Sequence, residues 1–233
     1  MKLAENIYFY PEDPSCDGAV LNAGAVVIDG AQKLIIDPGS EKRLPFLVKR
    51  MTADGLDPAT LDLALFTHSH PDHLGAGRAL RDTFGVAPAM HRLETDFLTG
   101  TGFGFNRRSF AREDFTVLEE GEFRFGGHRF HLYLTPGHSP GGLTLHWPEA
   151  KLLVVGDVYF QGTFGATDLP GGSEPEMFRT LEKLEKLEDV ELVLCGHGPA
   201  IAGREAIEEN YRVLAREVAM KKAGTWPGYS DLF

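Results

Sequence analysis

Histidine and aspartate residues gather in one short segment of the chain, at His68, His70, Asp72 and His73. Imidazole nitrogens and carboxylate oxygens are common ligands of zinc, and alternate residues of an extended segment point the same way. His68 and His70 can therefore share one metal ion. The turn that begins at Pro71 directs Asp72 and His73 to another side. The spacing predicts a metal site.

Three more residues of ligand type follow later in the chain, each in a glycine-containing loop after an apolar run. They are His138, Asp157 and His197. Seven such groups suit two divalent ions. The predicted assignment gives His68, His70 and His138 to the first ion, Asp72, His73 and His197 to the second, and Asp157 to both as a bridge. Zinc is the expected metal, and iron or manganese would accept the same ligands.

The remaining histidines are interpreted as ordinary surface or core residues. They are His91, His128, His131 and His146. A histidine without a second ligand beside it is usually structural. His128 and His131 share an alternating run that offers no such ligand, and His146 is followed directly by Trp147.

Apolar runs of strand length lead into the loops that carry the ligand-type residues. The predicted strands are Ala25–Ile28, Lys33–Ile36, Leu61–Phe66, Arg129–Leu134, Lys151–Val155 and Val190–Cys195, and the predicted helices are Leu44–Met51, Leu74–Phe84, Glu174–Leu187 and Arg204–Lys222. The segment Leu98–Arg112 is rich in glycine and aromatic residues without periodicity, so we predict a loop there. Strands dominate early and helices flank both halves, which predicts a sheet-on-sheet core covered by helices.

Four segments together resemble the metallo-β-lactamase superfamily in order and approximate spacing. They are Thr67–Gly75 (THSHPDHLG), Thr135–Gly141 (TPGHSPG), Gly156-Asp157 and Gly196–Gly198 (GHG). The resemblance runs from about Asn22 to Pro199. It implies an α/β fold, a four-layer αββα sandwich with the metals at one edge, as a single domain over residues 1–233. Asp37 resembles the family's first motif, which implies an acceptor that orients a ligand histidine.

Within the superfamily, the chain resembles the glyoxalase II-like (hydroxyacylglutathione hydrolase-like) enzymes. The segment Gly165–Gly172 (GATDLPGG) is similar to their GRTDLPGG segment, with Ala166 in place of a basic residue that helps to hold glutathione. The resemblance implies a binuclear hydrolase in which a metal-bound hydroxide attacks a carbonyl ester, thioester or lactone. Asp72 would act as a ligand and also take or return a proton. The alanine weakens the assignment to glutathione thioesters.

The predicted substrate contacts come from two places. They are Tyr159 and the loop residues Phe103, Phe105, Arg107 and Arg108. The loop could be a lid that replaces the basic group missing at Ala166, or a surface loop that packs its own aromatic rings. Tyr159 could donate a hydrogen bond to the substrate carbonyl, as a tyrosine does in lactonase-like relatives, or could be a core residue.

Other members of the superfamily give competing hypotheses. A mononuclear iron persulfide dioxygenase resembles the chain through the same histidine-rich segment but uses two histidines and one aspartate for its iron. A nucleic-acid processing enzyme is disfavoured because the short interval between His73 and His138 leaves no room for an inserted domain. A binder without catalysis would have lost ligand residues, and all seven are present.

Composition limits the partners. The 233 residues carry a formal net charge of −11, which argues against a nucleic-acid backbone as partner, so a small-molecule substrate is expected. The first residues, MKLAENIYFYPEDP, show no export signal, and no apolar run reaches the roughly 20 residues that span a membrane. We therefore expect a cytoplasmic protein without a membrane partner. The aromatic tail Thr225–Phe233 could dock onto a second copy, which would give a homodimer.

Overall fold

Two facing β-sheets form the centre of the computed structural model, which describes residues 1–12, 22–100 and 110–226. The first sheet has the order β1 (Lys2–Ala4), β2 (Ile7–Tyr10), β3 (Ala25–Ile28), β4 (Lys33–Ile36), β5 (Leu61–Leu65), β6 (Ala87–His91) and β7 (Thr116–Leu118). The second has the order β15 (Ile201–Ala202), β14 (Leu192–Cys195), β11 (Leu152–Gly156), β10 (Leu143–Trp147), β9 (His128–Leu134) and β8 (Gly121–Phe125). The strands β12 (Tyr159–Phe160) and β13 (Thr163–Phe164) form a small hairpin.

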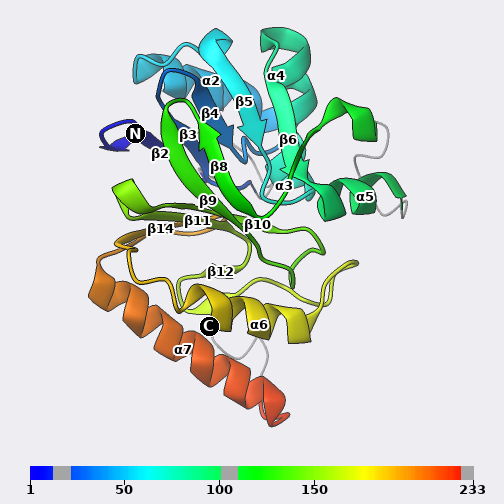
Figure 1. Cartoon of the computed structure of the whole chain (residues 1–233), viewed down its shortest axis with the longest axis vertical. Coiled ribbons are helices and arrows are strands. Elements are labelled where there is room, and N and C mark those ends of the chain that lie inside the picture. Colours follow the sequence, from blue (N-terminus) through cyan, green and yellow to red (C-terminus); the bar gives the residue numbers. More distant parts are fainter. Residues whose placement is uncertain (13–21, 101–109, 227–233) are drawn as a thin grey trace.

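Helices cover the outer faces of both sheets. They are α2 (Leu44–Ala53), α3 (Pro71–Leu74), α4 (Gly77–Phe84), α5 (Arg92–Gly100), α6 (Glu174–Leu184) and α7 (Arg204–Lys222). Helices α2 and α4 lie outside the first sheet, and α6 and α7 lie outside the second (Figure 1). This order of layers confirms the predicted αββα sandwich. Within the described residues, no helix is both long and apolar enough to cross a membrane.

Alternation along the strands explains why the sheets are covered on both faces. In β3, Ala25 and Val27 belong to the cluster beneath α2 and α4, whereas Val26 and Ile28 belong to the cluster between the sheets. In β11, Leu152 and Val154 face the space between the sheets and the intervening residues face α6 and α7. Successive strand residues point to opposite faces, so strands that are apolar at every position need cover on both.

Each predicted strand corresponds to a strand of the structure, and the differences concern one predicted helix, one predicted loop and several further strands. The segment Leu98–Arg112 was predicted as a loop, yet its first residues belong to α5, and residues 101–109 lie outside the described residues. The predicted helix Leu74–Phe84 is divided between α3 and α4 around Gly75. The strands β1, β2, β6, β7, β8, β10, β12, β13 and β15 were not predicted.

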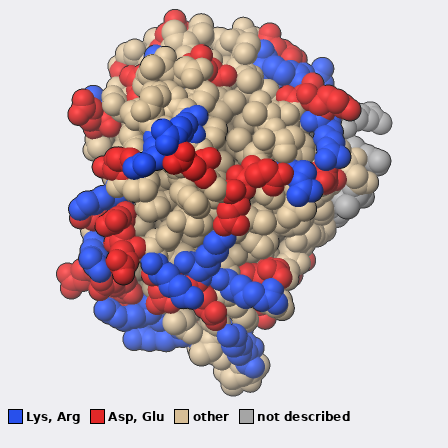
Figure 2. All heavy atoms as spheres, viewed as in Figure 1, with Lys and Arg blue, Asp and Glu red and all other residues tan. Residues whose placement is uncertain are grey.

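Acidic and basic side chains alternate over the surface that Figure 2 shows. Among the described residues on this face they form mixed groups of both signs rather than one continuous basic area. Many are paired, as with Arg204 and Glu208 on α7, whose Nε and Oε1 atoms lie 3.0 Å apart.

Candidate metal centre

Polar loops follow the carboxyl ends of two pairs of parallel strands. Strand β4 pairs in parallel with β5, and β11 pairs in parallel with β14. Parallel neighbours end at the same edge of a sheet, which is where α/β proteins commonly bind ligands. The loops after β4 and β5 carry Asp37 and Thr67, and those after β11 and β14 carry Asp157 and His197. Both sheets thus contribute to one site.

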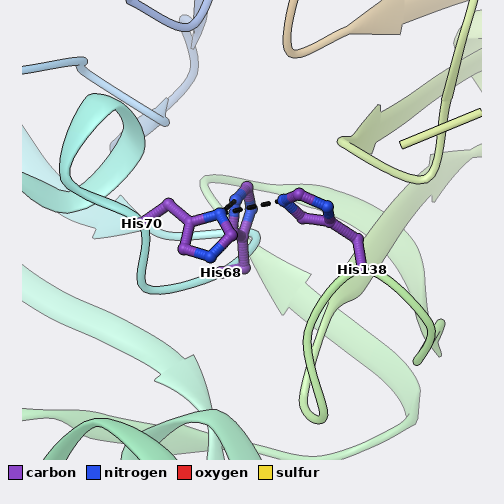
Figure 3. Close-up of side chains that lie close together, drawn as sticks. All are labelled: His68, His70 and His138. Atoms are coloured by element: carbon purple, nitrogen blue, oxygen red, sulfur yellow. Dashed lines mark hydrogen bonds between the residues drawn. The ribbon is translucent and has the colours of Figure 1, made fainter. Parts of the chain in front are cut away.

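Three histidine rings converge from two loops (Figure 3). The Nδ1 atom of His70 lies 3.0 Å from His68 Nε2 and 2.9 Å from His138 Nε2. A tetrahedral zinc ion with Zn–N bonds of about 2.0–2.1 Å holds its nitrogen ligands about 3.3 Å apart. The nitrogen–nitrogen distances therefore need to grow by only a few tenths of an ångström, roughly, to accept such an ion.

A second group lies beside the first. His197 Nε2 is 3.1 Å from Asp72 Oδ2, and His73 Nε2 is 3.8 Å from the same oxygen. The short helix α3 carries both Asp72 and His73, because its first residue, Pro71, is well suited to begin a helix directly after His70. Two nitrogens and one carboxylate oxygen again face a common point.

Asp157 lies between the two groups. Its Oδ1 atom is 3.2 Å from His73 Nε2, and its Oδ2 atom is 3.5 Å from His138 Nε2 and 3.4 Å from His197 Nε2. One carboxylate therefore contacts a histidine of the first group and both histidines of the second. This is the geometry expected of a bridging ligand.

Hydrogen bonds on the outer side of the rings determine which nitrogen faces the centre. His138 Nδ1 lies 2.8 Å from the carbonyl oxygen of Ala166, and His73 Nδ1 lies 2.8 Å from Asp37 Oδ2. Both oxygens only accept, so Nδ1 carries the hydrogen in each ring. In the neutral tautomer, Nε2 then presents its lone pair to the centre, as a metal ligand must.

Asp37 also acts on His68 through Thr67. The Thr67 hydroxyl donates to Asp37 Oδ2 at 2.6 Å, which leaves its oxygen free to accept from His68 Nδ1 at 3.1 Å. The backbone amide of Thr67 donates to Asp37 Oδ1 at 2.8 Å. Asp37 is 2% exposed and has a positive φ of 49°, a conformation that aspartate tolerates better than most residues. One buried carboxylate thus orients a histidine of each group.

Burial keeps His68 and His70 of the first group neutral. It lowers the pKa of His68 well below its usual value, and the neighbouring rings of His73, His70 and His138 add to this effect. Burial and the same kind of repulsion lower the pKa of His70 to about 4. Neutral imidazole is the form that binds a metal, so these residues are ready to act as ligands at neutral pH.

The carboxylates around the second group favour positive charge and raise the pKa of its two histidines. Burial lowers the pKa of His73, but Asp157 and Asp37 outweigh it and the net shift is well upward. Burial also opposes protonation of His197, while the nearby carboxylates of Asp157 and Asp72 raise its pKa to about 9. Clustered carboxylates therefore favour a cation at this position, which a divalent ion supplies better than protons do.

Unsatisfied polar atoms test whether a metal fits. Among the described residues, His73 Nε2, Asp157 Oδ1 and His197 Nε2 are buried without a hydrogen bond. Buried polar atoms in native proteins nearly always have a partner, and an ion accounts for such exceptions. The donor set of imidazole nitrogens and carboxylate oxygens suits zinc, iron and manganese. The residues present fit two divalent ions.

Close packing requires glycine beside the centre. A Cβ atom at Gly196 would lie 2.0 Å from Asp157 Oδ1 and 2.8 Å from His73 Cε1. Only a residue without a side chain allows the loop after β14 to approach Asp157 this closely. The position of His197, the next residue, depends on that approach.

Tyr159, one of the predicted substrate contacts, is not part of this arrangement. Tyr159 is 1% exposed, packs in the cluster beneath α6 and α7, and pairs its hydroxyl with that of Tyr211 at 3.1 Å. Of the two alternatives for Tyr159, these contacts favour the core residue: the side chain turns into the core, where burial raises its pKa. The lid residues Phe103, Phe105, Arg107 and Arg108 lie outside the described residues.

The four histidines interpreted as structural have ordinary neighbours. His91 Nε2 lies 3.5 Å from Glu119 Oε2, and His146 Nε2 lies 3.3 Å from the Asp189 carbonyl. His128 and His131 pack against Trp147 and Tyr133. Within the described part of the chain, none of the four belongs to a group that could hold a metal.

Sequence reasoning missed residues that act on the ligands from outside. Thr67 and the carbonyl of Ala166 each orient a histidine ring. Thr67 adjoins the histidine motif, so its position gave a signal that a hydroxyl partner was available. The carbonyl of Ala166 gave none, because every residue has one.

The fold and the two ligand groups define an α/β sandwich protein with a metal centre at one edge. A family model described as "Metallo-beta-lactamase superfamily" matches residues 19–197. The chain therefore belongs to the metallo-β-lactamase superfamily of metal-dependent hydrolases.

Two curated relatives are similar over most of their lengths. The "Probable metallo-hydrolase YqgX" of Bacillus subtilis is 34% identical over 74% of this chain and 83% of its own. The "Hydroxyacylglutathione hydrolase GloC" of Haemophilus influenzae is 32% identical over 76% of this chain and 85% of its own.

Two solved structures are similar at comparable identity. BLEG-1, described as a B3 metallo-beta-lactamase, has 28% identity and a TM-score of 0.70 over 89% of this chain and 99% of its own. TTHA1623, solved "in a di-iron-bound form", has 29% identity and a TM-score of 0.67 over 84% of this chain and 94% of its own.

Proposed function

We propose that this chain is a binuclear metal-dependent hydrolase that cleaves a carbonyl ester, thioester or lactone. His68, His70 and His138 would hold the first ion, Asp72, His73 and His197 would hold the second, and Asp157 would serve both. Zinc is the proposed metal. The description of TTHA1623 as di-iron-bound supports two ions in this fold and keeps iron among the candidates.

The convergence of the seven predicted residues is the observation that carries this proposal. They come from loops far apart in the sequence, and their ligand-type atoms form three overlapping groups, each within 4.8 Å. The overlap through His68, His73 and Asp157 joins the two ends of the centre. A site for a single ion would leave one group of these buried polar atoms without a partner.

The chemistry divides between the ions and the protein. Divalent ions bound here would act as Lewis acids toward a carbonyl oxygen and lower the pKa of a bound water to about 7. The side chain of Asp72 is 18% exposed, against 8% for Asp157, so Asp72 is the carboxylate open to solvent. We assign Asp72 the additional role of holding a proton during turnover and returning it to the leaving group. Asp37 and Thr67 keep the rings oriented.

The proposed class of substrate is based on the names of the relatives and on Ala166, which replaces a basic residue of similar enzymes. The name of the GloC relative supports thioesters of glutathione as a class to test. Ala166 lacks the basic group by which similar enzymes hold the glutathione carboxylate, so lactones and simpler thioesters are equally suitable. A β-lactam belongs in the same panel because of the description of BLEG-1. We propose a small-molecule substrate and a cytoplasmic location.

Elemental analysis of the purified protein, followed by assays on this panel, tests the proposal. We expect close to two metal ions per chain and hydrolysis of at least one carbonyl substrate. Replacing His70 with alanine should lower turnover at least about 100-fold while the circular dichroism spectrum stays unchanged. His131→Ala, which removes an imidazole outside the centre, is the matched control and should retain turnover.

Specific outcomes would overturn the proposal. One iron per chain together with oxygen consumption would identify the persulfide dioxygenase alternative instead. Full turnover by His70→Ala would remove this residue from the centre. A wild-type protein that binds no transition metal would contradict the hydrolase assignment as a whole.

A further inference from the structure

A fully buried carboxylate lies behind the histidine loops and belongs to none of the ligand groups. Glu94, in the first turn of α5, is 0% exposed. Its Oε1 atom accepts from the amide of Ser69 at 3.0 Å and from the Ser69 hydroxyl at 2.6 Å. Its Oε2 atom accepts from the amide of Gly141 at 2.8 Å.

Burial of a carboxylate costs folding free energy unless hydrogen bonds replace its lost hydration. An ionised carboxylate loses its hydration on burial and must recover it through hydrogen bonds. The three donors named above are all neutral groups, and two of them are backbone amides in loops. An apolar residue at position 94 would avoid the cost of burial, but it would leave these donors without acceptors.

The donors belong to the two loops that carry the first ligand group. Ser69 stands between His68 and His70, and Gly141 lies in the loop that carries His138. We propose that Glu94 is a positioning residue that fixes these loops relative to each other, so that the three histidine nitrogens meet at one point. This inference rests on the proposed metal centre and adds to it a residue outside the ligand set.

Close packing supports the same conclusion independently. A Cβ atom at Gly141 would lie 2.1 Å from the Glu94 amide nitrogen and 2.7 Å from its Cα atom. The loop of His138 therefore lies directly on the first turn of α5 and has no room to shift toward it. The hydrogen bond to Oε2 prevents the loop from moving away.

The second ligand group is held by different contacts. The backbone of Gly24 donates to the Gly196 carbonyl at 2.7 Å, that of Ala23 donates to the Asp72 carbonyl at 3.0 Å, and Asp37 binds the ring of His73. None of these contacts passes through Glu94. Loss of the Glu94 carboxylate should therefore lower the affinity for the first metal ion and leave the affinity for the second unchanged.

Glu94→Gln is the informative variant because it keeps the size of the side chain. A glutamine has one acceptor oxygen and an NH₂ group, so it can satisfy Ser69 or Gly141 but not both. We expect the affinity for one of two zinc ions, measured by competition with a chelator, to fall about 10–100-fold. Affinity for the other ion should stay at the wild-type value.

A double-mutant comparison identifies which ion is affected. In a His70→Ala background the first group is already disrupted, so Glu94→Gln should not change the affinity of the remaining ion. In a His197→Ala background the remaining ion is held by the first group, and Glu94→Gln should lower its affinity by the full amount. A general loss of folding would lower both alike, so this pattern separates positioning from stability.

The control is Asp96→Asn on the same helix, since Asp96 pairs with Arg112 at 3.1 Å on an exposed side. It should bind both ions as the wild type does. Should Glu94→Gln fail to fold, Ser69→Ala removes one donor and should give a smaller loss at the same ion. Wild-type affinity in Glu94→Gln, or in Ser69→Ala when Glu94→Gln does not fold, overturns the inference. A wild-type protein without metal overturns the proposed function instead.

Discussion

At the scale of the residue, one carboxylate controls the orientation of histidines in both ligand groups. Asp37 accepts from His73 directly and reaches His68 through the Thr67 hydroxyl. A ring that is free to rotate, or that carries its hydrogen on the wrong nitrogen, cannot act as a ligand. The affinity of both ions should therefore depend on a residue that touches neither.

Asp37→Asn tests this dependence. Asparagine tolerates the positive φ of this position, so the backbone should not change. Its NH₂ group cannot accept from His73 or Thr67, and we expect metal affinity to fall about 10–100-fold. Chelator competition measures the loss. Asp29→Asn, which removes a half-buried partner of Lys33 away from the centre, is the control. Equal affinity in the two variants would show that Asp37 does not orient the ligands.

The residues of the centre could be predicted from the sequence where they are of a type that commonly binds metal ions. Histidine and aspartate at short spacing are rare by chance, and the seven predicted residues lie together in the structure. Thr67, Glu94 and the carbonyl of Ala166 act through hydrogen bonds across the fold. Such contacts depend on tertiary structure, and neither residue type nor spacing predicts them. Both alternatives for Tyr159 stayed open in the sequence because alternation along β12 does not show which face is buried.

At the scale of the element, the centre depends on how closely the loops after β11 and β14 approach each other. Gly196 allows the approach because it places no side chain against Asp157. The two strands pair in parallel, with Gly156 opposite Cys195, so both loops leave the same edge of the sheet. Displacement of either loop would separate Asp157 from His197.

Gly196→Ala should therefore damage the centre more than the fold. The added Cβ atom would lie 2.0 Å from Asp157 Oδ1, so the loop must move. We expect turnover and the second metal ion to be lost, with a decrease of about 1–3 kcal/mol in the free energy of unfolding. Metal analysis and urea denaturation measure the two effects. Gly100→Ala, where a Cβ atom meets nothing within 4 Å, should change neither. Two bound ions in Gly196→Ala would contradict this account.

Helix and strand boundaries were predictable where apolar periodicity was strong. The predicted strand Lys33–Ile36 and helix Arg204–Lys222 agree with β4 and α7. Strand β6 was missed because Pro88 argues against a strand within a sheet. Helix α5 was missed because its buried face includes Glu94, and a polar residue there interrupts the apolar pattern.

At the scale of the whole molecule, the proposed ions join the two sheets. The loops after β5 carry His68, His70 and His73, whereas Asp157 and His197 follow strands of the other sheet. An ion that binds residues from both halves binds only the folded chain, so it stabilises the fold by mass action. Stability and metal content should therefore change together.

Chelation should lower the melting temperature. At free metal about 1,000 times the dissociation constant, bound metal contributes about 4.1 kcal/mol per site. A chain of this length shifts by about 2–4 °C per kcal/mol, so removing one such ion should lower the melting temperature by about 8–16 °C. Differential scanning calorimetry with and without EDTA measures the shift, and added zinc should restore it. An unchanged melting temperature in metal-free protein would contradict the bridging arrangement.

A histidine outside the centre should contribute to acid sensitivity. Burial lowers the pKa of His146 below its usual 6.5 in the folded chain. Below pH 6.5 the unfolded chain therefore binds more protons than the folded one at this residue, and stability is lost as pH falls. His146→Gln keeps a donor for the Asp189 carbonyl but cannot titrate. In metal-free protein, we expect the variant to lose less stability than the wild type between pH 7.5 and 5.5, by urea denaturation. An equal loss of stability in the variant and the wild type would contradict the lowered pKa of His146.

The bond between His138 and the backbone at position 166 has an evolutionary consequence. The carbonyl that holds the ring belongs to the main chain, so the side chain at this position can be exchanged while the ring keeps its partner. The residue type at position 166 can thus change in evolution without loss of the hydrogen bond that orients His138. If the side chain at this position contacts the proposed substrate, the preference for that substrate can change while the metal ligand stays in place.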